Sequence, residues 1–459
     1  MIREKRGSTV KDMTSGSILR HIILFALPLM FGNVFQMLYN TVDSIVVGNF
    51  VGKQALAAMG ATTPIVNMFV FFFNGFSVGA GVVIGNYFGA HDYDKLHDAI
   101  ETTVAATFAL CAIFTAVGIA GVDTMLRIMD TPDDVFSQAA LYLRIYIGGI
   151  SGLLVYNICS GILRAVGDST RPLYFLILTS VMNIVLDLAF VILLDAGIAG
   201  VAYATIIAQG VSAVLVIMSL MRTDSCIKIR VKALKLDMEM LKKIIKVGIP
   251  AAIQMAITSF SNIFVQSYIN FFGADCMSGW TAYSKIDQLL FLPMQSIALA
   301  STTFVGQNLG INKVDRAKKG VSTALIMAAI STVIVMIPVL IFAPHAVAFF
   351  NDKSEVVEIG TMLLRWISPF YVLCCVNQVY SGALRGAGNS RAPMLIMLTS
   401  FVVFRQIYLF VMANFISNTI LPIAMSYPAG WLLCSTLTFI YYHRTSLTKN
   451  RLVEDEPKK

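Results

Sequence analysis

The segment Ser160-Gly-Ile-Leu-Arg-Ala-Val-Gly-Asp-Ser-Thr-Arg-Pro172 returns later in the chain as Ser381-Gly-Ala-Leu-Arg-Gly-Ala-Gly-Asn-Ser-Arg-Ala-Pro393. The two copies are identical at 7 of 13 positions and lie 221 residues apart. Other pairs share this offset, or differ from it by one residue: Leu143-Arg144 with Leu364-Arg365, Gly85-Asn86 with Gly306-Gln307, and Pro28 with Pro250. The chain therefore contains an internal repeat, with one copy in each half.

The composition around this repeat excludes a soluble protein. Of the 459 residues, 57% are hydrophobic and only 13% are charged, whereas a soluble domain carries about 25% charged residues. So few charges cannot cover a globule of this size, and the remaining apolar surface must face lipid. The net charge of +8 could indicate nucleic-acid binding, so the placement of the basic residues decides its meaning.

Twelve apolar stretches are long enough to cross a bilayer, which takes about 20 residues as a helix. We predict spans at 19–43, 56–84, 99–121, 137–160, 172–193, 198–221, 247–270, 279–305, 321–343, 357–381, 393–413 and 419–442. Each copy of the repeat then holds six spans. Because six is even, both copies cross in the same sense, and we expect an axis along the membrane normal to relate them. The predicted fold class is an all-α membrane protein with twelve transmembrane helices in two homologous six-helix lobes.

Lysine and arginine alternate with these spans. One side of the membrane receives 27 of the 34 basic residues and the other side 3, while 4 fall within or at the ends of spans. The positive-inside rule places the basic side in the cytoplasm, so we expect both termini there and no nucleic-acid partner. The predicted domains are a tail at 1–18, an N-lobe at 19–221, a basic linker at 222–246, a C-lobe at 247–442 and a tail at 443–459. We expect the linker to lie at the lipid headgroups.

Ionisable side chains within spans are costly and are therefore functional candidates. Asp43 closes Tyr39-Asn-Thr-Val-Asp43 in the first span, and Asp187 lies four residues after Asn183 in the fifth. Residues four apart share a helix face, so an Asn amide can share a ligand with the carboxylate. We expect the two acids at similar depth and predict a proton or sodium site there. The alternative for Asp43 is a helix end at the membrane interface.

The second half carries fewer candidates. Arg405 has no charged counterpart in the repeat, so Arg405, Asp287 and Gln295 are candidates for contact with substrate or for charge compensation. Asp287 also lies close enough to Lys285 in the chain to form an interfacial pair. Arg144 and its repeat equivalent are expected to have structural roles, either by extending to the headgroups or by binding helix-end carbonyls.

The chain resembles the multidrug and toxic compound extrusion (MATE) transporters over roughly residues 15–442. The motifs that carry the resemblance are Pro28 followed by Asn40-x-x-Asp43, Gly85-Asn-Tyr-Phe-Gly-Ala90, Leu163-Arg-Ala-Val-Gly-Asp168, Asn183-x-x-x-Asp187, Gly200-Val-Ala-Tyr-Ala-Thr205, Leu292-Pro-Met-Gln295 and Val305-Gly-Gln-Asn-Leu-Gly310. The resemblance implies a V-shaped pair of lobes and export of hydrophobic, usually cationic compounds in exchange for H⁺ or Na⁺. It also implies a monomer in the inner (plasma) membrane, with no cofactor beyond the coupling ion.

The resemblance is to the DNA-damage-inducible-like prokaryotic branch, whose coupling cation binds in the N-lobe. The matching positions here are Asp43, Asn183, Asp187 and Thr205, and Asn40 belongs to the first motif. A further cluster asparagine aligns with Ser160, where a hydroxyl replaces the amide. The other branch uses carboxylates that would fall near Ser259 and Cys374, where this chain has no acid. The choice between H⁺ and Na⁺ stays open.

Three other functions are weighed against drug export. A flippase for a lipid-linked sugar has a similar helical layout, but it commonly has extra spans or a cationic central cavity. An intramembrane enzyme would need a constellation such as H-E-x-x-H, which is absent from the sequence. A channel fits less well, because the acids are not repeated symmetrically between the halves.

Overall fold

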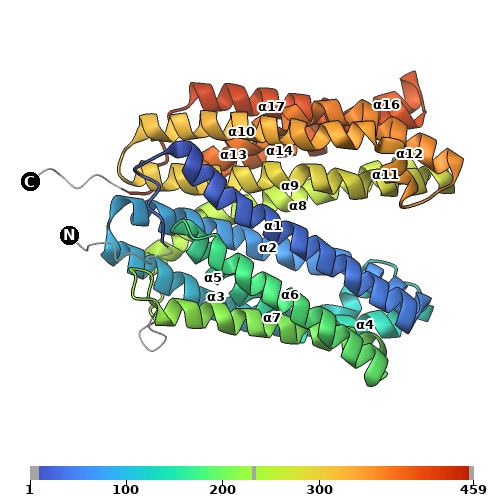
Figure 1. The fold of residues 1–459 in the computed structure, drawn as a ribbon, viewed down its shortest axis with the longest axis horizontal. Helices are drawn as coiled ribbons and strands as arrows, with labels where there is room; N and C mark the ends of the chain where they lie inside the picture. The colour runs from blue at the N-terminus through green and yellow to red at the C-terminus, as the bar shows by residue number, and fades with distance from the viewer. Residues whose placement is uncertain (1–9, 230–233, 454–459) are drawn as a thin grey trace, which may run out of the picture. The chain divides into compact units, whose positions relative to one another are not determined.

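The structure is a computed structural model that describes residues 10–229 and 234–453. Within these residues every regular element is a helix (Figure 1). The first half holds α1 (Ile18–Val46), η1 (Val47–Val51), α2 (Lys53–Ala90), α3 (Tyr93–Ile128), α4 (Asp133–Gly148), α5 (Ile150–Ala165), α6 (Thr170–Leu188), η2 (Ala189–Leu193) and α7 (Gly197–Arg222). The second holds α8 (Met238–Asn270), α9 (Ala274–Gly310), α10 (Val314–Ile341), α11 (Ala343–Ala348), α12 (Ser354–Ile367), η4 (Ser368–Phe370), α13 (Tyr371–Gly386), α14 (Arg391–Met397), η5 (Leu398–Phe404), α15 (Arg405–Val411), η6 (Met412–Ile416), α16 (Ile420–Ala424) and α17 (Ser426–Arg444).

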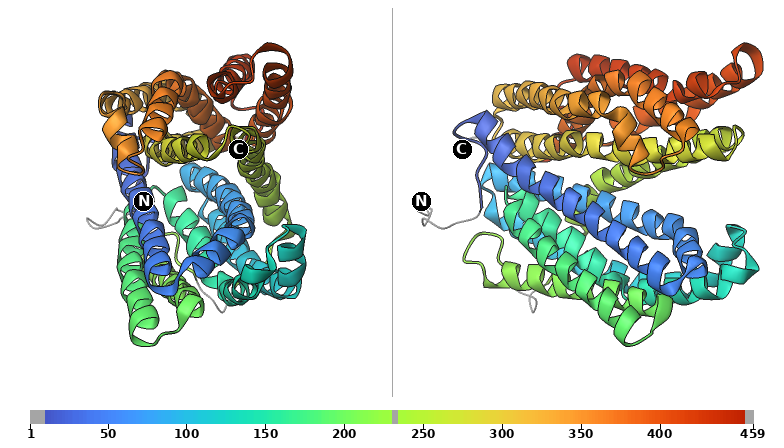
Figure 2. Two further views of the ribbon diagram at one scale, coloured as in Figure 1. Left: turned by 90° about the vertical axis from the view of Figure 1, so that its right-hand side faces the viewer. Right: turned by 45° about the vertical axis from the view of Figure 1, so that its right-hand side comes forward.

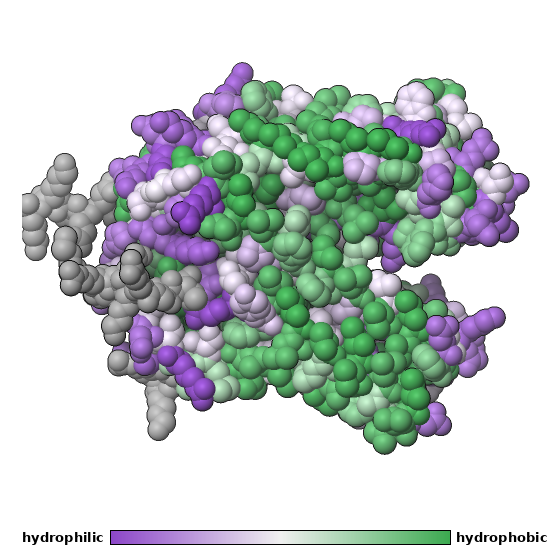
Figure 3. Space-filling view, in the orientation of Figure 1, coloured by the Kyte–Doolittle hydropathy of each residue, from purple (hydrophilic) through white to green (hydrophobic). Residues whose placement is uncertain are grey.

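The described helices confirm the predicted all-α class with twelve spans. They make up eleven stretches that are long and apolar enough to cross a membrane, or twelve if α4 and α5, which meet at a bend of 46°, count as one span. The sequence did not predict this bend, which lies at Gly149. A Cβ at Gly149 would lie 2.4 Å from the Cβ of Ile206, so the bend brings the backbone against α7. On the face shown in Figure 3, apolar side chains cover the middle of the helices and hydrophilic ones gather at their ends.

The repeated segments that open the sequence form the same turn twice, between α5 and α6 and between α13 and α14. Gly167 and Gly388 occupy these turns with φ of +83° and +81°, a conformation that L side chains rarely adopt. Asp168 accepts hydrogen bonds from two backbone amides at the start of α6, and Asn389 accepts one at the start of α14. The repeat is thus a helix–turn–helix whose second helix is capped by the residue after the glycine.

The chain forms two compact units. The first comprises residues 10–12 and 27–249 of the described chain, and the second comprises residues 13–26 and 250–453. The division falls inside α1 and inside α8, and Pro28 and Pro250 lie at these two points. Proline lacks the N–H that a helix interior uses, so each of the two helices misses a backbone hydrogen bond there. The sequence had assigned residues 19–26 to the first lobe.

Backbone contacts hold the segment before α1 in the second unit. Met13 N donates to Gln307 Oε1 at 2.9 Å, and Lys313 Nζ donates to the Thr14 carbonyl at 3.0 Å. Arg316 also donates to carbonyls of this segment. The segment therefore lies against the turn between α9 and α10.

Within each unit, two helices organise the packing. In the first, α2 contacts α3, α4 and α5, and α7 contacts α4, α5 and α6. In the second, α9 contacts α10, α12 and α13, and α13 contacts α17, so the yellow, orange and red helices lie side by side in Figures 1 and 2. The core of each unit lies along these shared helices.

The basic linker predicted at 222–246 differs from the structure at its second end. Helix α8 begins at Met238, where Asp237 Oδ1 accepts from the backbone amide of Glu239 at 2.7 Å. Lys243 Nζ, one turn later, lies 3.1 Å from the Tyr87 hydroxyl. The last nine of the 25 residues of the predicted linker are therefore helix that packs in the first unit. Residues 230–233 lie outside the described residues, as do parts of both predicted tails, 1–9 and 454–459.

Candidate functional site

Two buried acids meet inside the first unit. Asp43 on α1 is 3% exposed and Asp187 on α6 is fully buried. Their carboxyl groups interact electrostatically and lie within hydrogen-bonding reach of each other. The structure thus brings together the two residues on which the predicted cation site depends.

The cluster around these acids leaves polar atoms without partners. With both carboxylates ionised, the buried atoms that meet no hydrogen-bond partner among the described residues include Asp43 Oδ1, both oxygens of Asp187, and both Oδ1 and Nδ2 of Asn183. Buried polar groups are nearly always paired, so such a concentration needs an explanation. A proton on one acid would join the two carboxyl groups, and a cation would be ligated by these oxygens. The residues present therefore fit a small cation.

The helices that carry the acids end in π-helical turns. Helix α1 passes into η1 four residues after Asp43, and α6 passes into η2 two residues after Asp187. Single π-turns inside helices occur often at functional sites, since they interrupt the regular hydrogen-bond ladder. Both acids lie within about one turn of a segment with altered backbone pairing.

Tyrosines surround the acids, and sequence reasoning missed them. Tyr39, Tyr142 and Tyr146 interact electrostatically with Asp43, and Tyr142 stacks on Tyr146 with ring centroids 6.0 Å apart. Gln209 Nε2 is 3.4 Å from the Tyr146 hydroxyl. Two signals were available in the sequence: Tyr39 lies one turn before Asp43, and Tyr142 and Tyr146 are spaced four apart on one helix face.

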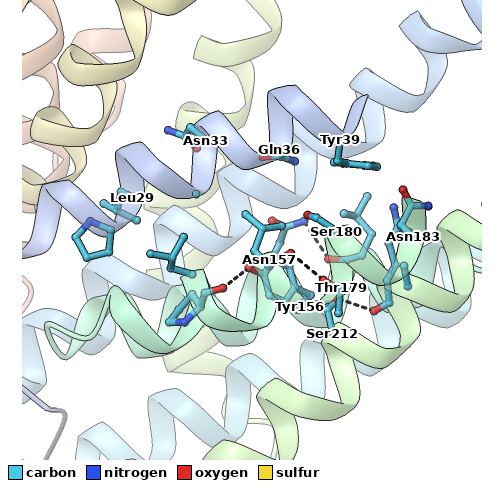
Figure 4. Close-up of a pocket in the computed structure, with 18 of the residues that line it drawn as sticks. Leu29, Asn33, Gln36, Tyr39, Tyr156, Asn157, Thr179, Ser180, Asn183 and Ser212 are labelled. Carbon is cyan, nitrogen blue, oxygen red and sulfur yellow. Dashed lines mark hydrogen bonds between the residues drawn. The ribbon is translucent and has the colours of Figure 1, made fainter. Parts of the chain in front are cut away.

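A cavity of about 130 Å³ with a mixed polar and apolar lining adjoins this cluster (Figure 4). It runs along α1 from Pro28 to Tyr39, roughly 16 Å of helix axis. Asn183 and Thr205 line it near the acids, and Arg164 lines it as well. Drug-sized ligands occupy pockets of about 300–1,000 Å³, so this cavity suits water and small ions better than a drug.

Three other predicted members of the site differ in their placement. Thr205 is buried and lines the cavity, with its hydroxyl donating to the Val201 carbonyl at 3.0 Å. Ser160 is fully buried on α5, and its hydroxyl has no hydrogen-bond partner among the described residues, but it does not line the cavity. Asn40 is exposed, and its side chain makes no hydrogen bond within the described chain, so the structure does not bring it to the cluster.

The second unit contains another acid, Asp287, on α9. Its predicted pairing with Lys285 does not form: Lys285 is exposed, and no basic group lies within 4.0 Å of Asp287 in the described chain. Residues two apart point to different sides of a helix, which explains the difference. The hydroxyls of Tyr371 and Tyr283 donate to Asp287 Oδ1 instead.

Arg405 is the largest fully buried side chain of the described residues, at 1% exposed. Its Nη1 donates to Ser261 Oγ at 3.1 Å and to Asn262 Oδ1 at 3.3 Å. Its guanidinium lies over the rings of Phe401 and Tyr427, 4.6 and 4.4 Å from their centroids. Arg405 is therefore held between two aromatic faces, with no carboxylate within 4.0 Å among the described residues.

The remaining polar and charged candidates are exposed. Gln295 and Arg365 lie on exposed helix positions. Arg144 was expected to extend to the headgroups or to bind carbonyls, but its Nη2 donates to both carboxylate oxygens of Asp123 at 2.7 and 2.8 Å. This correction reflects the packing of α3 beside α4, which span prediction alone does not give.

The fold and the buried acids together define a multi-pass membrane protein built from two repeated six-helix units. The MatE family profile matches residues 28–189 and again residues 250–411, which is one match for each copy of the repeat. The chain belongs to the MatE family, whose members are membrane transporters. The family resemblance stated from the motifs is confirmed.

Relatives and solved structures agree with this assignment over nearly the whole chain. The chain is 28% identical to the "Probable multidrug resistance protein YpnP" of Bacillus subtilis over 437 residues, covering 94% of this chain and 96% of that protein. It is 26% identical to the "Probable multidrug resistance protein NorM" of Thermotoga maritima, covering 95% and 96%. One similar solved structure, described as "Outward-facing conformation of a multidrug resistance MATE family transporter of the MOP superfamily", has a TM-score of 0.90 at 23% identity, covering 96% of this chain and 98% of that chain. This last likeness concerns the fold.

Proposed function

We propose that this protein is a secondary antiporter that exports hydrophobic, often cationic compounds in exchange for H⁺ or Na⁺. The names of its relatives support multidrug export, and the buried acid pair supports ion coupling. The proposal includes an inner (plasma) membrane location with both termini in the cytoplasm, following the basic-residue bias, and action as a monomer.

One observation carries the coupling role. The contact between Asp43 and Asp187, together with the partnerless polar atoms of Asn183, concentrates negative charge in a buried place. Two carboxylates in contact cannot both stay ionised without compensation, so the pair gains most from binding a cation. The protein would alternate between two states. In the ion-loaded state the charge of the pair is neutralised, and in the ion-free state the two carboxylates repel each other.

Coupling requires that this change alters the packing of the helices that carry the acids. Asp43 lies on α1, which begins in the second unit, whereas Asp187 lies on α6 within the first. Ion binding at the pair would therefore bias the position of a helix shared by both units. Alternating access between the lobes follows from that bias, because a ligand shifts an equilibrium by its differential affinity for the two states.

The decisive experiment reconstitutes the protein in liposomes and follows ethidium transport under an imposed proton gradient and, separately, under a sodium gradient. Asp43→Asn and Asp187→Asn keep the side-chain volume but remove each negative charge. Asp123→Asn, on an exposed acid of the same unit, is the matched control. We expect one gradient to drive transport by the wild type and the control, and both site variants to lose this transport while remaining folded and monodisperse.

The outcomes are distinct. The gradient that works identifies the coupling ion. Undiminished gradient-driven transport in both site variants would remove the coupling role from the acid pair. A wild type that moves no cation under either gradient would contradict export of organic cations and favour a lipid-linked substrate, which a fluorescent lipid scrambling assay would then detect.

A further inference from the structure

One face of α9 carries an acid between aromatic residues. Tyr283, Asp287 and Phe291 follow one another at intervals of four, so their side chains share a face of the helix. All three belong to the second unit. The repeat does not copy this acid, because the equivalent position in the first half is Val66. The arrangement is therefore specific to the second unit.

The two oxygens of Asp287 differ in their surroundings. Oδ1 accepts hydrogen bonds from the hydroxyls of both Tyr283 and Tyr371, and the two hydroxyls are 3.3 Å from each other. No hydrogen bond to Oδ2 is found among the described residues, and the side chain is only half-buried. The tyrosines thus fix the orientation of the carboxylate and leave its second oxygen available.

Aromatic rings continue from these tyrosines into a contiguous group. We call it the aromatic cluster: Trp280, Tyr283, Phe291, Tyr371, Tyr427 and Trp431. Tyr371 contacts Phe291 and Trp431 with ring centroids 5.5 and 5.3 Å apart. Most of these rings are buried against one another, at 5% exposed or less, whereas Phe291 and Tyr427 are partly exposed.

The buried arginine of this unit is not the counter-ion of Asp287. Arg405 has no oxygen of Asp287 within 4.0 Å, and its guanidinium is covered by Phe401 and Tyr427. At 1% exposed it is closed to a ligand. The half-buried carboxylate of Asp287 therefore keeps its negative charge uncompensated within the described part of the chain.

We propose that Asp287 and the aromatic cluster form a recognition site for organic cations, separate from the coupling pair of Asp43 and Asp187. The carboxylate supplies the opposite charge, and the partly exposed ring of Phe291, one turn further along α9, supplies cation–π attraction and apolar contact. A cation with delocalised or shielded charge and no N–H to donate, such as a phosphonium or quaternary ammonium, suits this site. Such a cation donates no hydrogen bonds, so the negative charge of Asp287 is the only polar partner that it requires. This inference rests on the proposed function and adds the place in the second unit that recognises the cation.

The test measures equilibrium binding of tetraphenylphosphonium to the purified full chain in detergent, with no ion gradient. Triphenylphosphine oxide, which is aromatic and uncharged, is the neutral comparison. Asp287→Asn retains an oxygen that can accept from both tyrosines and removes only the charge. The matched control is Asp275→Asn on the same helix, where the acid is 52% exposed and lies 3.5 Å from Lys353.

We expect Asp287→Asn to raise the Kd for tetraphenylphosphonium at least about tenfold, and to change the weaker binding of the neutral compound less than twofold. A tenfold change in Kd corresponds to about 1.4 kcal/mol, and its source is the lost Coulomb attraction between the carboxylate and the cation. Asp275→Asn should bind like the wild type. Phe291→Leu, which keeps a comparable apolar volume but removes a ring face, should weaken binding of the phosphonium more than that of the neutral compound.

Equal phosphonium binding by the wild type and Asp287→Asn would overturn the proposal, as would absence of phosphonium binding to the wild type. A parallel loss for the charged and the neutral compound would also overturn it, since this would indicate general damage to the fold. These outcomes are independent of ion coupling. Gradient-driven export could persist with recognition located elsewhere, and phosphonium binding at Asp287 could be measured even if no gradient drove transport.

Discussion

Gly79 of α2 and Gly248 of α8 are in backbone contact within the first unit. A Cβ at Gly79 would lie 2.6 Å from the Cα of Gly248 and 2.4 Å from the carbonyl oxygen of Ile244. Both distances involve backbone atoms, so a side chain at this position cannot be accommodated by a rotamer change. The first turns of α8 can lie directly against α2 because neither glycine carries a side chain at this crossing.

Gly79→Ala should therefore separate the two helices. We expect a loss of about 1–3 kcal/mol of stability, typical of overpacking, measured as a lower midpoint of thermal unfolding in detergent. Gly81→Ala on the same helix is the control, because its Cβ would lie 3.6 Å from the nearest atom, an ordinary contact. Equal midpoints for Gly79→Ala and the wild type would contradict the close contact.

The coupling pair should limit stability as well as drive transport. In sodium-free buffer at pH 8, Asp43→Asn should unfold at a higher temperature than the wild type, because the new amide can donate to Asp187 and the repulsion between two carboxylates disappears. We expect a gain of about 1–3 kcal/mol. Asp187→Asn should behave similarly, and the double variant should gain less than the sum of the two. A lower unfolding midpoint in both single variants would argue that the acids are not in contact.

Arg405 should resist replacement even by lysine. A lysine cannot stack a planar group between Phe401 and Tyr427, and its single ammonium does not reproduce the guanidinium geometry. We expect Arg405→Lys to lose about 2 kcal/mol or more in thermal unfolding. Arg365→Lys, at an exposed position of the same unit, should unfold like the wild type. Comparable midpoints for the two variants would show that the stacking contributes little.

Cys226 provides a test of topology and of pH dependence. It is the one cysteine of the seven that is not buried, and it lies in the predicted cytoplasmic linker between α7 and α8. Partial burial raises the pKa of its thiol. Because the thiolate is the reactive form, labelling by a membrane-impermeant maleimide should be slower at pH 7 than for a free cysteine and should accelerate as the pH rises. Inside-out vesicles should label and right-side-out vesicles should not, and Cys226→Ser should abolish the signal.

Much of the fold was predictable because the relevant signals are local. Apolar length located the spans, and the repeated thirteen-residue segment, with other pairs at the same offset, predicted the matching of the two halves. Asp43 and Asp187 could be nominated together because a charge in an apolar segment stands out wherever it lies. The bend at Gly149 was missed because the close approach to Ile206 that accompanies it involves another helix.

The side chains that surround each buried acid were less predictable from the sequence than the acids themselves. Asp287 gains its partners from Tyr371, on a helix that lies far along the chain, and nothing in the sequence marks that tyrosine among the 16 present. The tyrosines around Asp43 were missed although their spacing was visible, because the sequence does not show that the helix carrying Tyr142 and Tyr146 packs near Asp43. Side-chain pairing between distant segments depends on tertiary packing, whereas span prediction depends only on neighbouring residues.

The first turns of α1 belong to the second unit and the first turns of α8 belong to the first unit. This arrangement affects the order in which the two units can fold during synthesis. The first unit includes residues 238–249, which belong to the second copy of the repeat, and the second unit includes residues 13–26 from the first copy. Neither copy supplies all the parts of one unit, so a gene fragment cut at the linker encodes an incomplete core on either side. The ribosome must translate past the midpoint before the first unit is whole. The second unit is completed by residues 13–26, which leave the ribosome first and can pack only after the rest of that unit has been synthesised.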